Sequence, residues 1–128
     1  MGMRFHHVQV PCPAGSEDLL RGFYCGVLGL TEIAKPPLLA GEGGAWFRDG
    51  ETGPLEIHCS VEQPFRQPGK AHPGIAVDDV DAVATMVTAA AGEIVWDDRI
   101  PGVRRFHTRD PVGNRLEFQQ SGSTPERE

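Results

Sequence analysis

Apolar residues recur at every second position in several short stretches of the chain and at helical spacing in two longer ones. Alternation with a period of two predicts a half-buried strand, and spacings of three and four predict a helix with one apolar face. The helical spacing predicts helices at residues 16–29 and 78–92, the first capped by Ser16 and the second by Asp78 or Asp79. The alternation predicts strands over residues 5–11, 31–34, 45–48, 55–61, 72–77, 93–96, 104–108 and 114–120. Each half of the chain therefore consists of a strand, a helix and three further strands.

The two halves also share a motif at the turn before their last strand. Residues 48–57 (Arg-Asp-Gly-Glu-Thr-Gly-Pro-Leu-Glu-Ile) align without a gap with residues 109–118 (Arg-Asp-Pro-Val-Gly-Asn-Arg-Leu-Glu-Phe). Two copies of one motif indicate a duplicated module. The expected organisation is a single domain over residues 1–128, with module one at about 5–62, a linker at about 62–70, module two at about 71–120 and a frayed tail at 121–128.

The helix that follows the first strand of each half is a crossover, so neither sheet is a simple meander. We therefore predict an α+β fold of two strand-helix-three-strand (βαβββ) modules. With the helices on their outer faces, the two sheets would curl into an open barrel-like cleft lined by the polar strand faces.

Charge and composition exclude several classes of binding partner. The formal net charge of -6 argues against nonspecific binding to nucleic acid or to an anionic membrane surface. No apolar run approaches the roughly 18 residues of a spanning helix, and the N-terminus lacks the layout of a secretory signal. The three cysteines form no CxxC pair and fit reduced thiols. We therefore expect a cytoplasmic protein with no nucleic-acid or membrane partner.

The candidate chemistry lies on the polar strand faces. Each module opens with a histidine and closes with a glutamate, His7 and Glu56 in the first and His72 and Glu117 in the second. Two imidazoles and two carboxylates suit a divalent transition metal such as zinc, nickel, cobalt, manganese or iron. The duplication predicts where both pairs should lie, and all four residues are present. We therefore predict a metal site formed by these four residues.

A second histidine leaves one ligand open. His58 follows Glu56 by two residues, so both side chains face the same way and either could coordinate the metal. The repeat favours Glu56, because Glu117 is its counterpart. His58 could instead lie beside the ligands or replace Glu56. The remaining histidines, His6 and His107, we expect to be structural or exposed.

At this point the chain resembles the vicinal oxygen chelate (VOC) superfamily, the group of glyoxalases, bleomycin resistance proteins and ring-cleaving dioxygenases. The motifs that carry the resemblance span residues 5–120. They are His7-Val8-Gln9-Val10, Gly22-Phe23-Tyr24 leading to Leu28-Gly29-Leu30, Leu55-Glu56, His72-Pro73-Gly74-Ile75-Ala76-Val77-Asp78-Asp79-Val80-Asp81, and Asp110-Pro111-Val112-Gly113-Asn114-Arg115-Leu116-Glu117. The resemblance implies the glyoxalase/bleomycin resistance/dihydroxybiphenyl dioxygenase fold, and a homodimer with the metal site built between modules.

The resemblance also implies an activity. His7, Glu56, His72 and Glu117 match the metal positions of glyoxalase-like members, in which the metal chelates two neighbouring substrate oxygens. A ligand glutamate, Glu56 or Glu117, would shuttle the proton, and Glu117 is our choice for that base. We therefore expect a glyoxalase-like, divalent-metal-dependent lyase or isomerase acting on a small substrate with vicinal oxygens.

Other activities stay open. His58 to Val61 stand where glutathione-handling members have Asn-Trp-Gly, which argues against a glutathione hemithioacetal as substrate. One alternative is a metal-free binding protein of the bleomycin-resistance type, and another is a single-domain extradiol dioxygenase with iron on two histidines and one glutamate. A set of basic residues would either hold an anionic substrate at the rim or, in the favoured interpretation, line a solvated loop. These are Arg66, Lys70, Arg99, Arg104 and Arg105.

Overall fold

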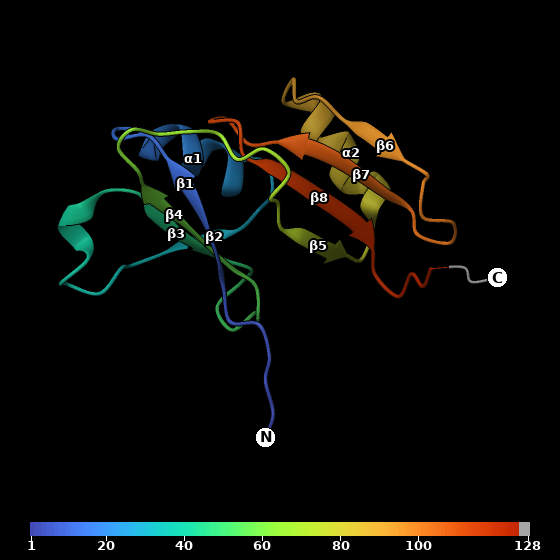
Figure 1. Ribbon diagram of the computed structural model, residues 1–128, viewed down its shortest axis with the longest axis horizontal. Helices are drawn as coiled ribbons and strands as arrows, with labels where there is room; N and C mark the ends of the chain where they lie inside the picture. Colours follow the sequence, from blue (N-terminus) through green and yellow to red (C-terminus); the bar gives the residue numbers. More distant parts are fainter. Residues whose placement is uncertain (126–128) are drawn as a thin grey trace. The chain divides into compact units, whose positions relative to one another are not determined.

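The computed structural model describes residues 1–125 of the 128-residue chain. The chain divides into two compact units, Met1–Gln67 and Pro68–Glu128. The first unit contains β1 (Val8–Cys12), α1 (Glu17–Tyr24), β2 (Thr31–Ile33), the short 3-10 helix η1 (Ala40–Glu42), β3 (Ala45–Arg48) and β4 (Glu56–Val61) (Figure 1). The second contains β5 (Gly74–Val77), α2 (Val80–Ala89), β6 (Val95–Asp97), β7 (Arg105–Arg109) and β8 (Arg115–Gln120). The predicted α+β order of strand, helix and three strands is confirmed in both units.

The two sheets have the same topology. Their strand orders are β1-β4-β3-β2 and β5-β8-β7-β6. In each sheet the first strand pairs parallel with the last, and the other neighbours pair antiparallel. Neither sheet closes on itself, because each has two edge strands. A parallel pair cannot be joined by a tight turn, so the helix of each unit belongs to a long connection between the two paired strands.

Each unit has its core between the helix and one face of the sheet. In the first unit Leu20 and Tyr24 of α1 are fully buried, as is Phe47 of β3, whose ring stacks on that of Tyr24 at 5.1 Å. In the second, Val80 and Val87 of α2 are buried, and α2 contacts β8. The opposite face of each sheet carries the polar residues.

The predicted ends of the helices need correction. The first was expected to reach Gly29 but ends at Tyr24, and a series of turns follows it. Gly29 still adopts the left-handed conformation expected of it, with φ 76°. Ser16 occupies the N-cap position, but its hydroxyl donates to the carbonyl of Pro13 (2.7 Å) and makes no side-chain cap. Asp79 does cap α2, since its Oδ1 accepts from the N–H of Ala82 at 3.0 Å.

The remaining boundaries concern the linker and the tail. The boundary between the two units falls between Gln67 and Pro68, inside the segment 62–70 that the sequence predicts to be a linker. The tail expected to fray at 121–128 lies partly outside the described residues, at 126–128. Within residues 1–125, no helix has the length and apolar character needed to cross a membrane.

Candidate metal centre

The second unit gathers polar side chains on the face of its sheet that lies away from α2. Phe106 of β7 and Leu116 and Phe118 of β8 are buried on the core side. Successive side chains of a strand point to opposite faces, so the residues between these three lie on the other side. That polar face carries His107 from β7 and Glu117 from β8.

The tight turn between β7 and β8 decides which of these residues meet. Oδ1 of Asp110, which is 4% exposed, accepts hydrogen bonds from the backbone N–H groups two and four residues further on, at 3.1 and 2.9 Å. The turn sets Arg109 opposite Arg115 and, two residues along each strand, His107 opposite Glu117. The turn signal of the sequence therefore fixes the register of the site.

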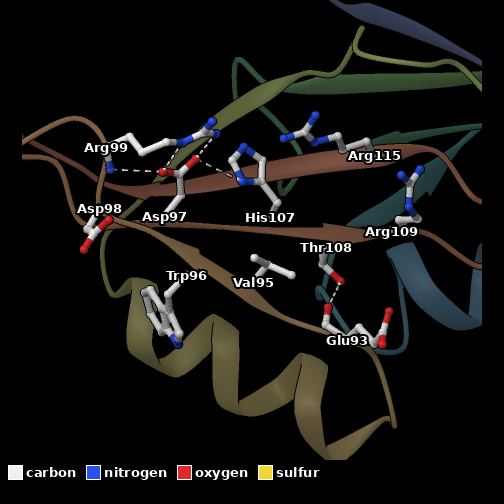
Figure 2. Close-up of a pocket in the computed structure, with 10 residues that line it drawn as sticks. All are labelled: Glu93, Val95, Trp96, Asp97, Asp98, Arg99, His107, Thr108, Arg109 and Arg115. Carbon is white, nitrogen blue, oxygen red and sulfur yellow. Dashed lines mark hydrogen bonds and ion pairs between the residues drawn. The ribbon is translucent and has the colours of Figure 1, made fainter.

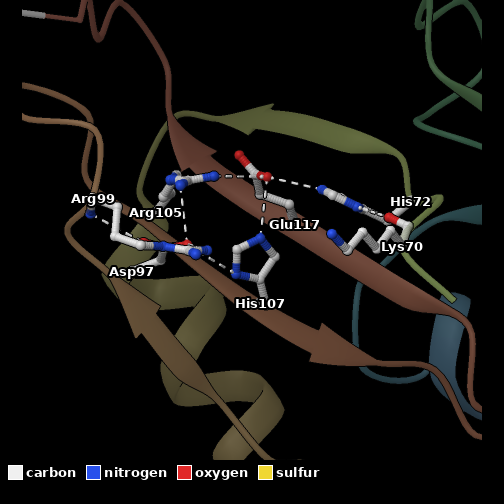
Figure 3. Close-up of polar contacts among 7 residues, drawn as sticks. All are labelled: Lys70, His72, Asp97, Arg99, Arg105, His107 and Glu117. Atoms are coloured by element: carbon white, nitrogen blue, oxygen red, sulfur yellow. Dashed lines mark hydrogen bonds and ion pairs between the residues drawn. The ribbon is translucent and has the colours of Figure 1, made fainter.

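One oxygen of Glu117 is the centre of the cluster. Its Oε1 lies 3.0 Å from Nε2 of His72, 3.2 Å from Nε2 of His107 and 3.1 Å from Nη1 of Arg105. Figure 3 shows the three side chains converging on this carboxylate from β7 and from the segment before β5. Ligand atoms of His72, His107 and Glu117 all lie within 4.8 Å of one another, and residues 1–125 contain no other such group of three.

The surroundings of His72 favour a cation at the centre of this cluster. Its Nδ1 lies 2.7 Å from the carbonyl oxygen of Lys70, which can only accept a hydrogen bond. In the neutral ring the proton is therefore on Nδ1, and the lone pair of Nε2 points toward Glu117. A metal ion at this place would accept that lone pair together with an oxygen of Glu117. The donor set thus fits a divalent transition metal.

Asp97 and Arg105 support the cluster from β6 and β7. The guanidinium of Arg105, 9% exposed, bridges Glu117 through Nη1 and Asp97 through Nη2 at 3.0 Å. Asp97 also accepts from Nη2 of Arg99 at 2.6 Å, and its Oδ2 lies 3.8 Å from Nδ1 of His107. A carboxylate behind a histidine orients the ring toward a metal. Arg105 therefore fixes the position of Glu117, and Asp97 lies behind the ring of His107.

Electrostatics hold the ligand atoms in the forms that bind a metal. Burial would raise the pKa of Glu117, but hydrogen bonds from His72 and Arg105 and the charge of Arg105 lower it overall. Burial lowers the pKa of His107, and the charge of Arg115 lowers it further. The hydrogen bonds from Arg99 hold the pKa of Asp97 well below its usual range. At neutral pH the carboxylates are therefore ionised and the His107 ring is neutral.

The first unit holds a different arrangement at the corresponding place. Glu56 Oε1 lies 3.0 Å from Nε2 of His58, and its Oε2 lies 3.7 Å from Nη1 of Arg48. The ring of His58 is stacked between His7 (centroids 4.1 Å apart) and Trp46 (3.8 Å apart). Burial lowers the pKa of His58, and the hydrogen bond with His58 lowers the pKa of Glu56. His58, the proposed alternative to Glu56, is therefore in direct contact with it.

The four residues predicted to form one site divide equally between the units. His72 and Glu117 are in contact in the second unit. His7 and Glu56 lie in the first, where each contacts His58. His107, expected to be structural or exposed, is 7% exposed and faces Glu117. Counting back along both strands from the turn at residues 110–114 places His107 opposite Glu117. The turn motif in the sequence could therefore have identified His107 as a site residue.

A pocket of about 440 Å³ opens on the same polar face, beside His107. Figure 2 shows acidic and basic side chains around it, with Asp97 and Arg99 at one end and the guanidinium groups of Arg109 and Arg115 at the other. The residues that line it are Glu93, Val95, Trp96, Asp97, Asp98, Arg99, His107, Thr108, Arg109 and Arg115.

Comparison with known proteins gives a consistent family. A family model described as the Glyoxalase/Bleomycin resistance protein/Dioxygenase superfamily matches residues 4–118. CFP32 of Mycobacterium bovis, a protein provisionally named a glyoxylase, is 35% identical over 99 residues. That match covers 75% of this chain and 36% of CFP32, so the chain spans about a third of the length of this relative.

Solved structures show the same fold over nearly the whole chain. A glyoxalase-family protein from Bacillus anthracis has a TM-score of 0.87 and 38% identity, with 94% of this chain and 96% of that chain covered. A lactoylglutathione lyase from Agrobacterium tumefaciens has a TM-score of 0.71 at 21% identity, with 94% and 95% covered. At that identity the likeness is one of fold.

Proposed function

Because the chain belongs to the Glyoxalase/Bleomycin resistance protein/Dioxygenase superfamily, we propose that it is a divalent-metal-dependent, glyoxalase-like lyase or isomerase. Its substrate is a small molecule with two neighbouring oxygens. The observation that carries the proposal is the cluster in which His72, His107 and Glu117 bring three ligand atoms within 4.8 Å of one another. The sequence adds His7 and Glu56, or His58 in place of Glu56, as ligands from the first unit.

The metal ion would supply a Lewis acid that polarises the substrate oxygens. The protein's own residues supply the proton transfer and the orientation. Oε1 of Glu117 takes all the contacts of that carboxylate with the described residues, and Oε2 makes none. Oε2 is therefore the atom that accepts a proton from the substrate carbon beside the oxygens and returns it. Arg105 keeps the carboxylate ionised and fixes its orientation.

Metal analysis of the purified protein tests the proposal. We expect about one zinc, nickel, cobalt, manganese or iron ion per chain after reloading with each metal. Alanine variants of His72, His107 and Glu117 should lose it, and Glu62→Ala, a change at an exposed glutamate of the first unit, should keep it. Metal-loaded protein should then convert 1,2-dicarbonyl or 2-hydroxy-carbonyl substrates.

The variants also decide the ligand set. Metal lost from His7→Ala and Glu56→Ala but kept in His107→Ala would favour the four residues predicted from the repeat. Loss from His58→Ala but not from Glu56→Ala would make His58 the ligand. A chain that binds no metal under any loading would contradict the proposal and support a metal-free binding protein of the bleomycin-resistance type.

One observation favours a second activity. The cluster in the second unit consists of two histidines and one glutamate, the set that holds iron(II) in many oxygenases. A single-domain extradiol dioxygenase is therefore the alternative function. Oxygen consumption by the iron-loaded protein with catechol-type substrates separates the two, because a lyase or isomerase consumes none.

A further inference from the structure

Two arginines face each other across β7 and β8 in the pocket beside the cluster. Arg109 and Arg115 are direct partners in the antiparallel ladder, and both line the pocket. Figure 2 shows both side chains in the same half of the pocket, with the guanidinium group of Arg115 on the side toward His107. Like charges directly opposite each other in a sheet are destabilising. The arrangement therefore costs the empty protein free energy that an anion between the two arginines would recover.

Neither arginine has an acidic partner among the described residues. Arg109 donates from Nη1 to the carbonyl of Gly113 at 3.0 Å, and the side chain of the half-buried Arg115 makes no hydrogen bond or ion pair within residues 1–125. Glu93 and Asp98 also line the pocket, but within residues 1–125 neither forms an ion pair with the two arginines. Among the acidic residues of the part of the chain that the structure describes, none forms an ion pair with these two positive charges.

Three of the five basic residues selected from the sequence differ in this respect. Arg99 is bound to Asp97, Arg104 to Asp81, and Arg105 to both Asp97 and Glu117. Their guanidinium groups are occupied by carboxylates of the same unit. Among the basic residues that line the pocket, Arg109 and Arg115 are the two without a carboxylate partner within residues 1–125.

The position of the pair relates it to the metal cluster. His107 and Glu117 form the next facing pair on the same side of the sheet, two residues along each strand. At roughly 3.4 Å per residue, the two rows are about 7 Å apart. One small molecule can therefore place two neighbouring oxygens at the cluster and a charged group, several bonds away, between the arginines.

We propose that the pocket binds a substrate with a separate anionic group, a carboxylate or a phosphate, held by Arg109 and Arg115. The planar guanidinium fork donates two parallel hydrogen bonds to such an oxyanion. The role of this group as part of a substrate rests on the proposed function of the neighbouring cluster. The binding of the anion itself depends on the arginines alone.

Anion titration of chelator-treated protein tests the inference without the metal. Inorganic phosphate and acetate are added in separate series against sodium chloride at equal ionic strength, and thermal unfolding and calorimetric affinity are measured. At least one of the two anions should raise the unfolding temperature of the wild type. Arg109→Met and Arg115→Met should weaken that affinity about tenfold or more. Arg4→Met removes the same charge from an exposed site in the first unit and should leave the affinity unchanged.

The anion series also identify the group, because preference for phosphate or for acetate tells which oxyanion fits. Stabilisation by neither anion beyond that of chloride would overturn the inference, as would equal affinity in Arg115→Met and the wild type. His72→Gln separates the two proposals, because His72 belongs to the cluster but does not line the pocket, so the variant should lose the metal and keep the anion response. A wild type that binds the anion but no metal would refute the proposed function and leave the anion site standing.

Discussion

Replacing Arg105 by methionine is the sharpest test of how the cluster is held together. The substitution keeps an unbranched side chain of similar length and removes the charge that bridges Glu117 and Asp97. Arg105 and Glu117 have side chains only 10% and 12% exposed, so water cannot replace the lost contact. Breaking a buried ion pair by removing one partner costs about 3–5 kcal/mol. Because Glu117 keeps its contact with His72, we expect a loss near the lower limit, about 3 kcal/mol.

The loss should depend on pH. The pKa values of Glu117 and Asp97 are lowered in the folded chain, so their contribution to stability is complete above the pKa of the unfolded carboxyls. That contribution disappears as the pH falls through the folded pKa values. The difference between Arg105→Met and the wild type should therefore be largest near pH 7 and should shrink toward pH 3.

Urea unfolding at several pH values measures both effects, with the m-value as a check that the denatured state is unchanged. Arg104→Met is the matched control, since Arg104 contacts Asp81 at 2.5 Å but the two side chains are 56% and 61% exposed. Solvent screens that pair, so its removal should cost much less in spite of the shorter distance. Equal losses in the two variants, or a loss in Arg105→Met that does not vary with pH, would refute the reasoning.

Three further outcomes are expected. Asp110→Ala removes the carboxylate that accepts from two buried N–H groups of the β7–β8 turn, and it should lower the free energy of unfolding in urea by about 2 kcal/mol. Asp49→Ala, at the exposed counterpart in the first unit, should lower it little. The wild type should lose stability between pH 7 and 5, because the pKa of buried His107 is lowered and the unfolded chain therefore binds a proton that the folded chain does not. His107→Gln should lose less stability over the same interval. Parallel curves of unfolding free energy against pH for the two proteins would contradict this. Glu117→Gln keeps the side-chain volume and should lower turnover of the metal-loaded enzyme by about 100-fold or more with an unchanged circular dichroism spectrum; full activity with normal metal content would exclude Glu117 as the base.

The order of elements could be predicted from the sequence because it depends on local information. Alternation and helical spacing are properties of neighbouring residues, and the repeated turn motif relates the two halves. The end of the first helix was predicted less well. Gly29 correctly marks the left-handed residue, but the helix stops at Tyr24, and the turns between them leave no trace in the apolar spacing.

The candidate site was only partly predictable because its contacts cross between strands. Glu117 and His72 followed from the repeat, but the role of His107 depends on the register that Asp110 sets. Arg105 is bound by two carboxylates and Arg115 by none within residues 1–125, and this difference depends on which side chains face each other. Residue type alone cannot supply that information. Counting the hairpin register from the turn predicts that His107 faces Glu117, but it does not predict which arginine is bound by carboxylates.

The topology of the two sheets also constrains the order in which the chain can fold. β4 is the last strand of its unit in sequence but lies between β1 and β3, and Val8 of β1 pairs with Ile57. In the second unit β8 holds the same place, and Gly74 of β5 pairs with Glu117. Until β4 has left the ribosome, β1 has no strand to pair with, and a nascent chain that ends before Glu56 presents three strands without their central one. Such non-local pairing slows folding. Each unit is therefore completed in a single late step, and the same step that closes the second sheet brings Glu117 to His72.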